Sequence, residues 1–397
     1  MKILMVLESV FPQDERVEKE IASLTEEGHE VRIATYSFTQ SSSEQLYQNY
    51  VIYRRRMSKL MYRLGAAILI HPFYFNFWRR YLQEIFRTWN FDALHIHDLP
   101  LTRLGSEYKR KHRILFVADQ HEFYSSWIVK TAHYNSLPGR VIRFLSNWKA
   151  YEGKHLRQAD LVCTVEEPLR EMYIRQYGLD PLKVIIIPNT PRKSVYDVEP
   201  GNVSDDHFNL FYCGGLDRLR GLDTAIRALP LLRERIPEVR LVLTGRKNKY
   251  YDPRRQAAVQ GVEDLLELRE WVDYRELPHE IDLGDVCFFI PPADREEIHN
   301  TIATKIYQYM ARGKPVVVGS ARYMKEFVEK HGIGITIDET SPREFADAVL
   351  RIYTDGGLRK RFSENSKKTI REFYWEKTIM KLLDFYRTAG QDEVINP

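Results

Sequence analysis

The sequence contains few cysteines and no long run of apolar residues. Only three of its 397 residues are cysteine, and each lies in an apolar, strand-like stretch far from the others. Widely separated cysteines of this kind predict reduced thiols in a core, and they argue against a disulfide framework or a cysteine-based metal site. The residues are Cys163, Cys213 and Cys287.

The N-terminus also lacks the features of a secretory signal. Its apolar run, within Met1–Val10, is too short for a signal-peptide core, and Glu8 stands where a cleavage region would be small and neutral. We therefore expect this run to be the first buried strand and the protein to be cytoplasmic. A hydrophobic content of 44% over 397 residues, without repeats, predicts an ordinary globular protein of roughly two to three domains.

Positive charge is concentrated in the first half of the chain, although the net charge of the whole is only +4. Residues 1–195 hold 28 Lys and Arg against 21 Asp and Glu, and residues 47–157 alone hold 19 against 7, a net charge of +12. Aromatic residues are interleaved with the arginines there, in YRRRMSKLMYRLGAAILIHPFYFNFWRRYLQEIF. Such a segment suits an anionic surface, either phospholipid or nucleic acid.

Two interpretations of this basic segment stay open. Its purest apolar stretch, Leu64–Ile70, is far below the roughly 20 residues that span a bilayer, so the segment could lie on a membrane but not cross one. Alternatively, Leu60, Leu64 and Ile68 pack onto a sheet and the arginines form a solvated face. None of the usual nucleic-acid-binding modules is visible in the sequence, so we expect no nucleic acid partner.

Strand-like and helix-like runs alternate along the whole chain. Lys2–Leu7 is predicted as a strand, Arg16–Glu27 as a helix ended by Gly28, and Val31–Tyr36 as the next strand. Further strands are expected at Ala93–Ile96, Ile114–Ala118, Leu161–Val165 and Val184–Ile187, then at Leu210–Cys213, Arg240–Thr244, Cys287–Ile290, Val316–Val318 and Ile335–Ile337. A polar segment without apolar periodicity, Pro191–His207, separates the two series. This order predicts an α/β chain of two doubly wound, Rossmann-like domains.

The stretch Val286–Ser320 holds the strongest local signal for a ligand. An apolar strand, a polar loop, a helix at Ala303–Ala311 and a second strand follow one another, and Gly313 with Pro315 ends the helix. The start of a helix in such a βαβ unit presents free backbone N–H groups and a positive dipole end, where phosphorylated ligands bind in open α/β sheets. The polar side chains placed there are Asn300, Thr301, Thr304, Lys305 and Gln308.

Phrases along nearly the whole chain resemble one family of enzymes. They are FPQDERVEKEIASLTEEGHEV, HIHDLPL, ADQHEFY, ADLVCTVEEPLREMY and VIIIPNTP, followed by FYCGGLDRLRGLDTAIRALP, KIYQYMARGKPVV and REFYWEKTIMKLLDFY. Their order and spacing, from Met1 to about Tyr386, resemble the family-four (group 1) glycosyltransferases, which are retaining enzymes of GT-B architecture. Single phrases of this kind occur widely, so the resemblance depends on their order.

The resemblance implies two Rossmann-like domains that face each other across a cleft. Residues 1–195 would bind the acceptor, residues 196–375 would bind a nucleotide-diphosphate sugar, and a helix in 376–397 would cross back to the first domain. The implied reaction moves a sugar to an acceptor hydroxyl, in the synthesis of a cell-surface glycan or glycolipid, with no cofactor. The implied partners are the sugar donor, a glycan or lipid-linked acceptor and, through residues 47–157, the anionic inner face of a membrane.

On the acceptor side, the resemblance assigns His121 to contact with the transferred sugar. This residue follows the expected strand Ile114–Ala118, at the end of the sheet where open α/β folds bind ligands; a plain turn is the alternative. His95, His97 and Asp98 close the preceding strand, but a tetrahedral metal site needs ligands that this motif does not offer, so packing or acceptor lining is preferred. The acceptor-side candidates are Asp14, Arg16, His97, Asp98, Asp119 and Glu122.

On the donor side, a glycine turn with an arginine follows the first strand of the second domain. Small residues let the backbone approach a diphosphate, and the Arg220 guanidinium can bind it through two hydrogen bonds. The family more often has arginine where Gly215 stands and lysine where Arg220 stands. Lys305 is expected to supply the missing charge, with Arg218 and Arg246 as alternatives. The donor-side candidates are Gly214, Gly215, Gly245, Arg246, Glu297, Asn300, Thr301, Thr304 and Gln308, besides Arg220 and Lys305.

A second departure concerns two glutamates, separated by seven residues, that the family uses for the sugar and the ribose hydroxyls. Asn300 and Gln308 stand at their places, and an amide lacks the charge that makes a carboxylate a strong acceptor. Glu296 or Glu297 could reach the sugar through a shifted loop. An inactive nucleotide-binding homologue and a nucleotide-sugar epimerase of the same fold are therefore kept as alternatives.

The chemistry expected of these residues centres on the leaving diphosphate. Negative charge develops on it as the sugar–nucleotide bond breaks, and stabilising that charge is the main task of the site. The sequence contains no Asp-x-Asp phrase, so we expect no metal ion to bridge the diphosphate. Arg220, Lys305 and helix N-termini would stabilise it instead, while His121 holds the sugar for front-side attack by the acceptor hydroxyl.

Overall fold

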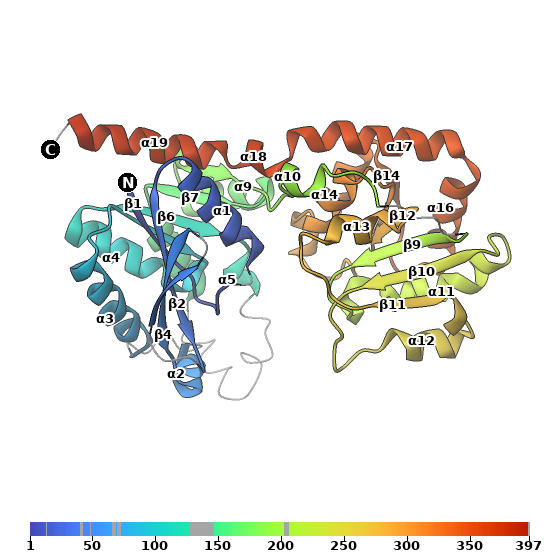
Figure 1. Cartoon of the computed structure of the whole chain (residues 1–397), viewed down its shortest axis with the longest axis horizontal. Coiled ribbons are helices and arrows are strands. Elements are labelled where there is room, and N and C mark those ends of the chain that lie inside the picture. Colours follow the sequence, from blue (N-terminus) through green and yellow to red (C-terminus); the bar gives the residue numbers. More distant parts are fainter. Residues whose placement is uncertain are drawn as a thin grey trace. The chain divides into compact units, whose positions relative to one another are not determined.

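The computed structural model of the protein describes residues 1–12, 14–39, 43–47, 49–65, 69, 73–127, 147–201 and 206–395 (Figure 1). These residues form two compact units. Unit 1 is Met1–Pro188 together with Ile379–Pro397, and unit 2 is Asn189–Thr378. Each unit is an α/β fold with a wholly or mainly parallel sheet of its own, which confirms the predicted fold class.

Unit 1 is built on an eight-stranded sheet in the order β3-β4-β2-β1-β5-β6-β7-β8. Neighbouring strands are parallel except for β3, which pairs antiparallel with β4. The strands are β1 (Lys2–Val6), β2 (Glu30–Ser37), β3 (Ser43–Tyr47), β4 (Tyr50–Arg56), β5 (Ala93–His97), β6 (Leu115–Gln120), β7 (Leu161–Thr164) and β8 (Val184–Ile186). Because β1 pairs with β2 on one side and with β5 on the other, the strand order switches direction between β1 and β5, where such sheets bind ligands.

The helices described in unit 1 differ in how much apolar surface they bury. They are α1 (Glu15–Glu26), α2 (Lys59–Leu64), α3 (Phe73–Thr88), α4 (Thr102–His112), α5 (Tyr124–Trp127), α8 (Trp148–Leu156), α9 (Glu167–Tyr177) and α19 (Met380–Ile395). Helices α3 and α4 lie side by side (Figure 1), joined by an ion pair of 2.6 Å between Arg79 and Glu107. The last helix, α19, belongs to unit 1 although the whole of unit 2 precedes it in the chain.

The basic segment folds as strands and helices of unit 1. One strand within it, β4, was not predicted, because its arginines hide the apolar pattern; Arg54 is nevertheless buried and donates a hydrogen bond to the Phe11 carbonyl oxygen at 3.1 Å. The expectation that Leu60 packs onto the sheet is wrong. Leu60 is 68% exposed, because α2 is too short to bury a stripe. The Leu64 side chain and Ile68 lie outside the described residues.

Unit 2 is built on a parallel six-stranded sheet in the order β11-β10-β9-β12-β13-β14. The strands are β9 (Phe208–Cys213), β10 (Val239–Thr244), β11 (Leu266–Arg269), β12 (Val286–Phe289), β13 (Val316–Val318) and β14 (Gly334–Thr336). Leu210 of β9 lies opposite Leu241 of β10 and Val286 of β12, so the switch point lies between β9 and β12. The longer helices are α11 (Leu222–Arg233), α12 (Pro253–Gln260), α13 (Leu277–Asp282), α14 (Thr304–Ala311), α15 (Arg322–His331), α16 (Pro342–Thr354) and α17 (Gly356–Thr369).

The polar segment 191–207 packs on unit 2 over much of its described length. Its short helix α10 (Lys193–Tyr196) places Tyr196 in the core of unit 2 at 1% exposure. Arg312 donates hydrogen bonds to the carbonyl oxygens of Tyr196 and Val198, at 2.6 and 2.8 Å. A single buried tyrosine among polar residues leaves no periodicity, which is why the sequence pattern did not show this packing.

Each unit has its own hydrophobic core. The central strand β9 is buried at every position, as expected for a parallel strand covered on both faces. All three cysteines are free and buried, which confirms the prediction of reduced core thiols. Among the helices of the described residues, none has both the length and the apolarity needed to cross a bilayer.

Candidate functional site

A pocket of about 400 Å³ lies at the carboxyl ends of β9, β10 and β12 in unit 2. The last residues of these strands, Cys213, Thr244 and Phe289, all line it. This is the switch point of the sheet, where open α/β folds bind their ligands. Helix α14 also starts here, and its N-cap residue, Ala303, has no side chain that could accept from the first backbone N–H groups. The fold therefore directs a helix N-terminus into this unit 2 pocket.

The described residues that line the unit 2 pocket include two cations and no carboxylate. The lining residues are Cys213, Gly214, Arg220, Thr244, Gly245, Trp271, Val272, Leu277, Phe289, Ile298, Thr301, Ala303, Thr304, Lys305 and Gln308. A cavity with this charge is suited to an anionic ligand.

The two cations of the pocket differ in their surroundings. Lys305 Nζ lies 5.0 and 4.3 Å from the ring centroids of Tyr212 and Phe289, and no carboxylate of the described chain forms an ion pair with it. Burial lowers the pKa of Lys305 to about 8, because the charged form loses water. Arg220 is 40% exposed, with Nε 3.4 Å from Asp217 Oδ2. The pocket thus contains a lysine whose charge is not compensated and an arginine whose weak partner is local.

Two glycines, Gly245 and Gly221, allow close backbone contacts beside the pocket. A Cβ atom on Gly245 would lie 1.7 Å from the Gly214 carbonyl oxygen, and one on Gly221 would lie 1.9 Å from the Ile290 carbonyl oxygen. Gly221 also has a φ of 77°, in the left-handed region that favours glycine. A side chain at Gly245 would displace the turn that carries Gly214, and one at Gly221 would push the turn that carries Arg220 away from the Ile290 backbone.

Seven of the predicted donor-side residues line the unit 2 pocket. They are Gly214, Arg220, Gly245, Thr301, Thr304, Lys305 and Gln308. Gln308 is buried at 6% exposure, and its spacing of three from Lys305 places both on one face of α14. The helical spacing in the sequence was therefore sufficient to group these two residues.

Four of the predicted donor-side residues do not line the pocket: Gly215, Arg246, Glu297 and Asn300. Arg246 lies over the ring of Trp271, with 4.6 Å between the guanidinium carbon and the ring centroid. Asn300 is held by its neighbours, because Nδ2 donates to Glu296 and Oδ1 accepts from Arg322 at 3.1 Å. Glu297 Oε1 lies 3.9 Å from Arg295 Nη1.

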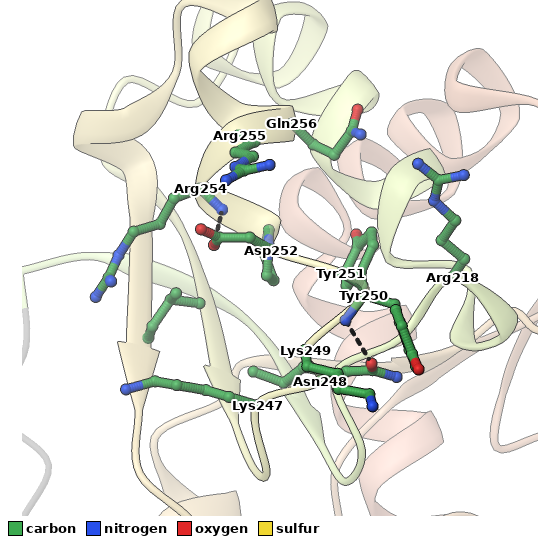
Figure 2. Close-up of a pocket in the computed structure, with 13 residues that line it drawn as sticks. Arg218, Lys247, Asn248, Lys249, Tyr250, Tyr251, Asp252, Arg254, Arg255 and Gln256 are labelled. Carbon is green, nitrogen blue, oxygen red and sulfur yellow. Dashed lines mark hydrogen bonds between the residues drawn. The ribbon is translucent and has the colours of Figure 1, made fainter.

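Arg218 lines a different pocket of unit 2, of about 390 Å³ (Figure 2). Figure 2 shows basic side chains around this second pocket, beside the start of α12, where Asp252 accepts from the Arg254 backbone N–H at 3.1 Å. One of these cations, Lys247, is already paired with Glu270 at 2.7 Å. Arg218 therefore does not line the unit 2 pocket. Arg246 does not line it either, so neither alternative for the missing cation belongs to that lining.

In unit 1, several acceptor-side candidates form one buried network at the carboxyl ends of β5 and β6. Arg16 Nη2 donates to Asp119 Oδ1 at 2.6 Å, and Arg16 Nε donates to Glu20 Oε1 at 3.1 Å. The other oxygen of Asp119 lies 2.7 Å from His121 Nε2 and 3.1 Å from His97 Nδ1. Burial by itself would raise the pKa of the Asp119 carboxyl, but Arg16 and His121 hold it well below its usual range.

His121 is the member of this network that reaches solvent. Its side chain is 18% exposed, whereas those of Arg16 and Asp119 are 3% and 1% exposed. Burial and Arg16 tend to lower the pKa of His121, but the neighbouring carboxylates of Asp119 and Asp98 outweigh them and raise it. His121 is therefore a histidine whose cationic form is favoured beside a fixed carboxylate.

The other acceptor-side candidates are placed around this network. Asp14 caps α1, because its side chain accepts from the backbone N–H of Arg16 at 3.2 Å and of Val17 at 3.3 Å. Asp98 has a φ of 64° and its N–H donates to the Asp119 carbonyl oxygen at 2.9 Å. Glu122 is exposed.

Sequence reasoning did not single out two further members of the network. Glu20 follows Arg16 by four residues, the spacing at which an acid and a base meet on one helix face, so a signal was present. Tyr386 contacts His95 Nδ1 through its hydroxyl at 3.2 Å, and no local pattern indicates that contact. Burial and the charge of Asp119 raise the pKa of Glu20 to about 7.

Two more residues near the sites were not predicted. Glu8 accepts a hydrogen bond from the Tyr74 hydroxyl at 2.6 Å, and burial raises the pKa of Glu8 to about 7.

Trp271 lines the unit 2 pocket while 51% exposed, so its ring offers a surface on which a flat group can stack. An exposed tryptophan just after an edge strand is the signal that would have indicated it.

Two family models match the chain in succession. Residues 16–190 match Glycosyltransferase Family 4, and residues 197–369 match Glycosyl transferases group 1. An uncharacterized glycosyltransferase of Methanocaldococcus jannaschii is 24% identical, over 92% of this chain and 91% of that protein. A D-inositol 3-phosphate glycosyltransferase of Nocardioides sp. is 23% identical, over 60% of this chain and 56% of that protein.

Solved structures agree with these matches. Sucrose-phosphate synthase from Thermosynechococcus elongatus has a TM-score of 0.74 at 16% identity, covering 98% of this chain and 99% of that chain. Anabaena HepE, solved in complex with UDP, has a TM-score of 0.67 at 14% identity, covering 98% and 100%. The fold and the sequence matches together define a glycosyltransferase of the GT-B type. The chain belongs to the group 1 glycosyltransferases, as the resemblance of its phrases predicted.

Proposed function

We propose that the chain is a retaining glycosyltransferase that moves a sugar from a nucleoside diphosphate sugar to an acceptor hydroxyl, without a metal ion on the diphosphate. The observation that supports this most directly is the lining of the unit 2 pocket, whose described residues join two cations and a helix N-terminus with no carboxylate. A diphosphate gains from all three features. As the sugar bond breaks, charge grows on the leaving group, so contacts to Arg220 and Lys305 would strengthen in the transition state.

The state of Asp119 in unit 1 favours front-side attack. Both oxygens of this carboxylate are engaged, one by Arg16 and the other by His97 and His121, so it is poorly suited to attack the sugar and form a covalent intermediate. In the proposed step, the acceptor oxygen bonds to the anomeric carbon on the face from which the diphosphate leaves. The leaving diphosphate oxygen takes the hydroxyl proton. We assign His121 to holding the sugar.

The names of the relatives support a glycolipid or cell-surface acceptor. One relative, of Mycobacterium tuberculosis, is named as a GDP-mannose-dependent phosphatidylinositol monomannoside mannosyltransferase and is 28% identical over 42% of this chain and 44% of that protein. We infer that unit 1 binds the acceptor, and that it does so while attached to the anionic inner face of a membrane. Three exposed apolar side chains near the arginines support that attachment: Leu60, Tyr62 and Phe73, at 68%, 48% and 56% exposure.

Calorimetric titration of UDP and GDP into the full chain tests the donor site. We expect Arg220→Ala and Lys305→Met each to weaken nucleotide binding by roughly tenfold or more, since each removes a charge-assisted contact. Arg218→Ala is the matched control, because Arg218 stands two residues from Arg220 but lines the second pocket. Wild-type affinity in both Arg220→Ala and Lys305→Met would contradict the assignment of the site.

Product analysis tests the reaction itself. Transfer from a set of nucleoside diphosphate sugars to inositol phosphate and lipid acceptors should give a product with the anomeric configuration of the donor, as read by nuclear magnetic resonance. Adding Mg²⁺ or Mn²⁺ should leave the rate unchanged. An inverted product would overturn the retaining mechanism, and a strict requirement for added Mg²⁺ would overturn the role given to the two cations.

A further inference from the structure

The unit 1 network contains a compact group of four metal-ligating residues. They are Glu20 on α1, His95 and His97 on β5, and Asp119 on β6. All four are fully buried, and one ligand atom from each lies within 4.8 Å of those of the others. In the sequence, the histidine motif lacked further ligands. The fold supplies two carboxylates, Glu20 from helix α1 and Asp119 from the neighbouring strand β6.

Three polar atoms of this group have no hydrogen-bond partner among the described residues. They are Glu20 Oε2, His95 Nε2 and His97 Nε2. Glu20 Oε2 lies 3.7 Å from His95 Nε2. Buried polar atoms are nearly always paired, so three such atoms in one cluster indicate that something occupies the space between them.

The second nitrogen of each imidazole and the second oxygen of the Glu20 carboxylate each contact a protein partner. His97 Nδ1 lies 3.1 Å from Asp119 Oδ2, His95 Nδ1 lies 3.2 Å from the Tyr386 hydroxyl, and Glu20 Oε1 accepts from Arg16 at 3.1 Å. Metal-binding histidines usually donate their second N–H to a carboxylate or another oxygen, which fixes the ring and leaves the other nitrogen free to bind. The two histidines here have that arrangement.

We propose that Glu20, His95 and His97 bind one divalent zinc-type metal ion in unit 1, with Asp119, Arg16 and Tyr386 orienting the three ligands. Two imidazole nitrogens and one carboxylate oxygen form a donor set that zinc accepts. Zinc bonds of about 2.0–2.1 Å at tetrahedral angles hold ligand atoms roughly 3.4 Å apart, so a cluster whose ligand atoms lie within 4.8 Å of one another needs to contract by up to roughly 1.4 Å. Glu20 and Asp119 bring two carboxylates to the cluster, beside the Arg16 guanidinium and the His121 imidazole. The ion is separate from the diphosphate site in unit 2.

A buried water molecule is the main competing occupant. Water could donate to Glu20 and to one imidazole, and Arg16 Nη1, which also has no partner among the described residues, could bind a second water. Only a metal ion, however, would bind the three atoms with a defined stoichiometry and with competition by a chelator.

Metal binding by the full-length wild-type chain decides between these occupants. The protein is stripped with a chelator, desalted, and titrated with Zn²⁺ against a zinc-responsive dye and with Co²⁺ by visible absorption. We expect one equivalent of either ion per chain, the visible band of a low-coordinate cobalt site, and a higher melting temperature with zinc. No stoichiometric binding and no change in melting temperature would overturn the proposal, whatever the variants do.

Variants then identify the ligands. His95→Asn and Glu20→Gln should each weaken zinc binding by roughly 100-fold or more, checked in samples whose circular dichroism matches the wild type. His155→Asn is the matched control: His155 is a buried histidine of the same unit whose ring contacts Ser106 Oγ at 3.0 Å, away from this cluster. Unchanged affinity in both His95→Asn and Glu20→Gln would place the metal elsewhere and overturn the assignment.

Discussion

Arg16 in unit 1 and Lys305 in unit 2 are both cations at the ligand-binding edge of a parallel sheet, yet their surroundings are opposite. Arg16 is 3% exposed and pairs with Asp119 and Glu20, at 2.6 and 3.1 Å. Lys305 packs on the rings of Tyr212 and Phe289 with no ion pair to any carboxylate that the structure describes. A matched cation fixes the groups around it, whereas an unmatched one keeps its charge for a ligand. The difference separates a positioning network from a binding site.

Removing Arg16, the paired cation of unit 1, should have the largest effect on stability. Arg16→Met keeps most of the apolar stem but removes the guanidinium that pairs with both Asp119 and Glu20. We expect the free energy of unfolding of unit 1 to fall by about 3–5 kcal/mol, measured by urea denaturation. Arg220→Met is the control and should lower the free energy of unfolding of unit 2 by less than about 1 kcal/mol, because that side chain is 40% exposed. Equal losses in the two variants would remove the contrast between the units.

Lys305, the cation of unit 2 without an ion pair to a described carboxylate, predicts a pH dependence of ligand binding. With a pKa of about 8, Lys305 is mostly charged at pH 7 and loses its proton as the pH rises through 8. A diphosphate has lost its last proton by about pH 7, so its own charge is then constant. We expect nucleoside diphosphate affinity, measured by calorimetry, to fall by roughly tenfold between pH 7 and pH 9. A bound phosphate raises the pKa of the lysine in the complex, so the fall begins near the pKa of about 8 in the free protein and continues to higher pH.

Lys305→Arg is the control for this pH effect. An arginine stays charged throughout the range, so its affinity should be nearly independent of pH. The same slope in Lys305→Arg and wild type would show that another group titrates.

A carboxylate at position 308 would sharpen the comparison by giving the unit 2 pocket an acid that serves the ligand instead of a fixed cation. Gln308→Glu restores the acid that the family more often has, and it should raise nucleoside diphosphate affinity several-fold through a charge-assisted hydrogen bond to a ribose hydroxyl. Asn300→Glu is the matched control, since Asn300 does not line the pocket, and it should change affinity by less than about twofold. A larger effect from Asn300→Glu would mean that the loop moves when the ligand binds.

Arg246→Ala should have the smallest effect. Arg246 is exposed and lies over the Trp271 ring outside the pocket lining, and an exposed cation–π contact contributes about 0.5–1 kcal/mol. We expect a change of that size or less in the free energy of unfolding of unit 2 and almost none in nucleotide affinity. A tenfold loss of affinity in the calorimeter would instead make Arg246 the additional cation.

Most strands could be predicted from the sequence because parallel strands covered on both faces are continuous apolar runs, as in β9. The strands missed, β3, β4 and β11, lie at or next to the edges of the sheets, where polar side chains are tolerated. SEQLY in β3 is largely exposed, and LELR in β11 is half-buried. An edge strand therefore resembles a loop when only apolarity is read.

The sites were predictable where residues directly follow a strand or share one helix face. Asp119 lies at the end of β6 and His121 directly follows that strand, while Lys305 and Gln308 share α14. Contacts between distant segments were not predictable, since Tyr386 and His95 are 291 residues apart and nothing near either residue indicates the other. The placement of Asn300 outside the pocket lining also depends on Arg322, a contact made only once the helices of unit 2 have packed.

The return of α19 to unit 1 affects the order in which the chain can fold during translation. Tyr386 is fully buried in unit 1, with its ring centroid 5.7 Å from that of His29 and 6.2 Å from that of His95. Unit 2, in contrast, is continuous in sequence and is complete when Thr378 leaves the ribosome. Unit 1 therefore cannot complete its core until α19 has followed unit 2 out of the ribosome, so the apolar side chains that α19 covers stay exposed in the nascent chain until then.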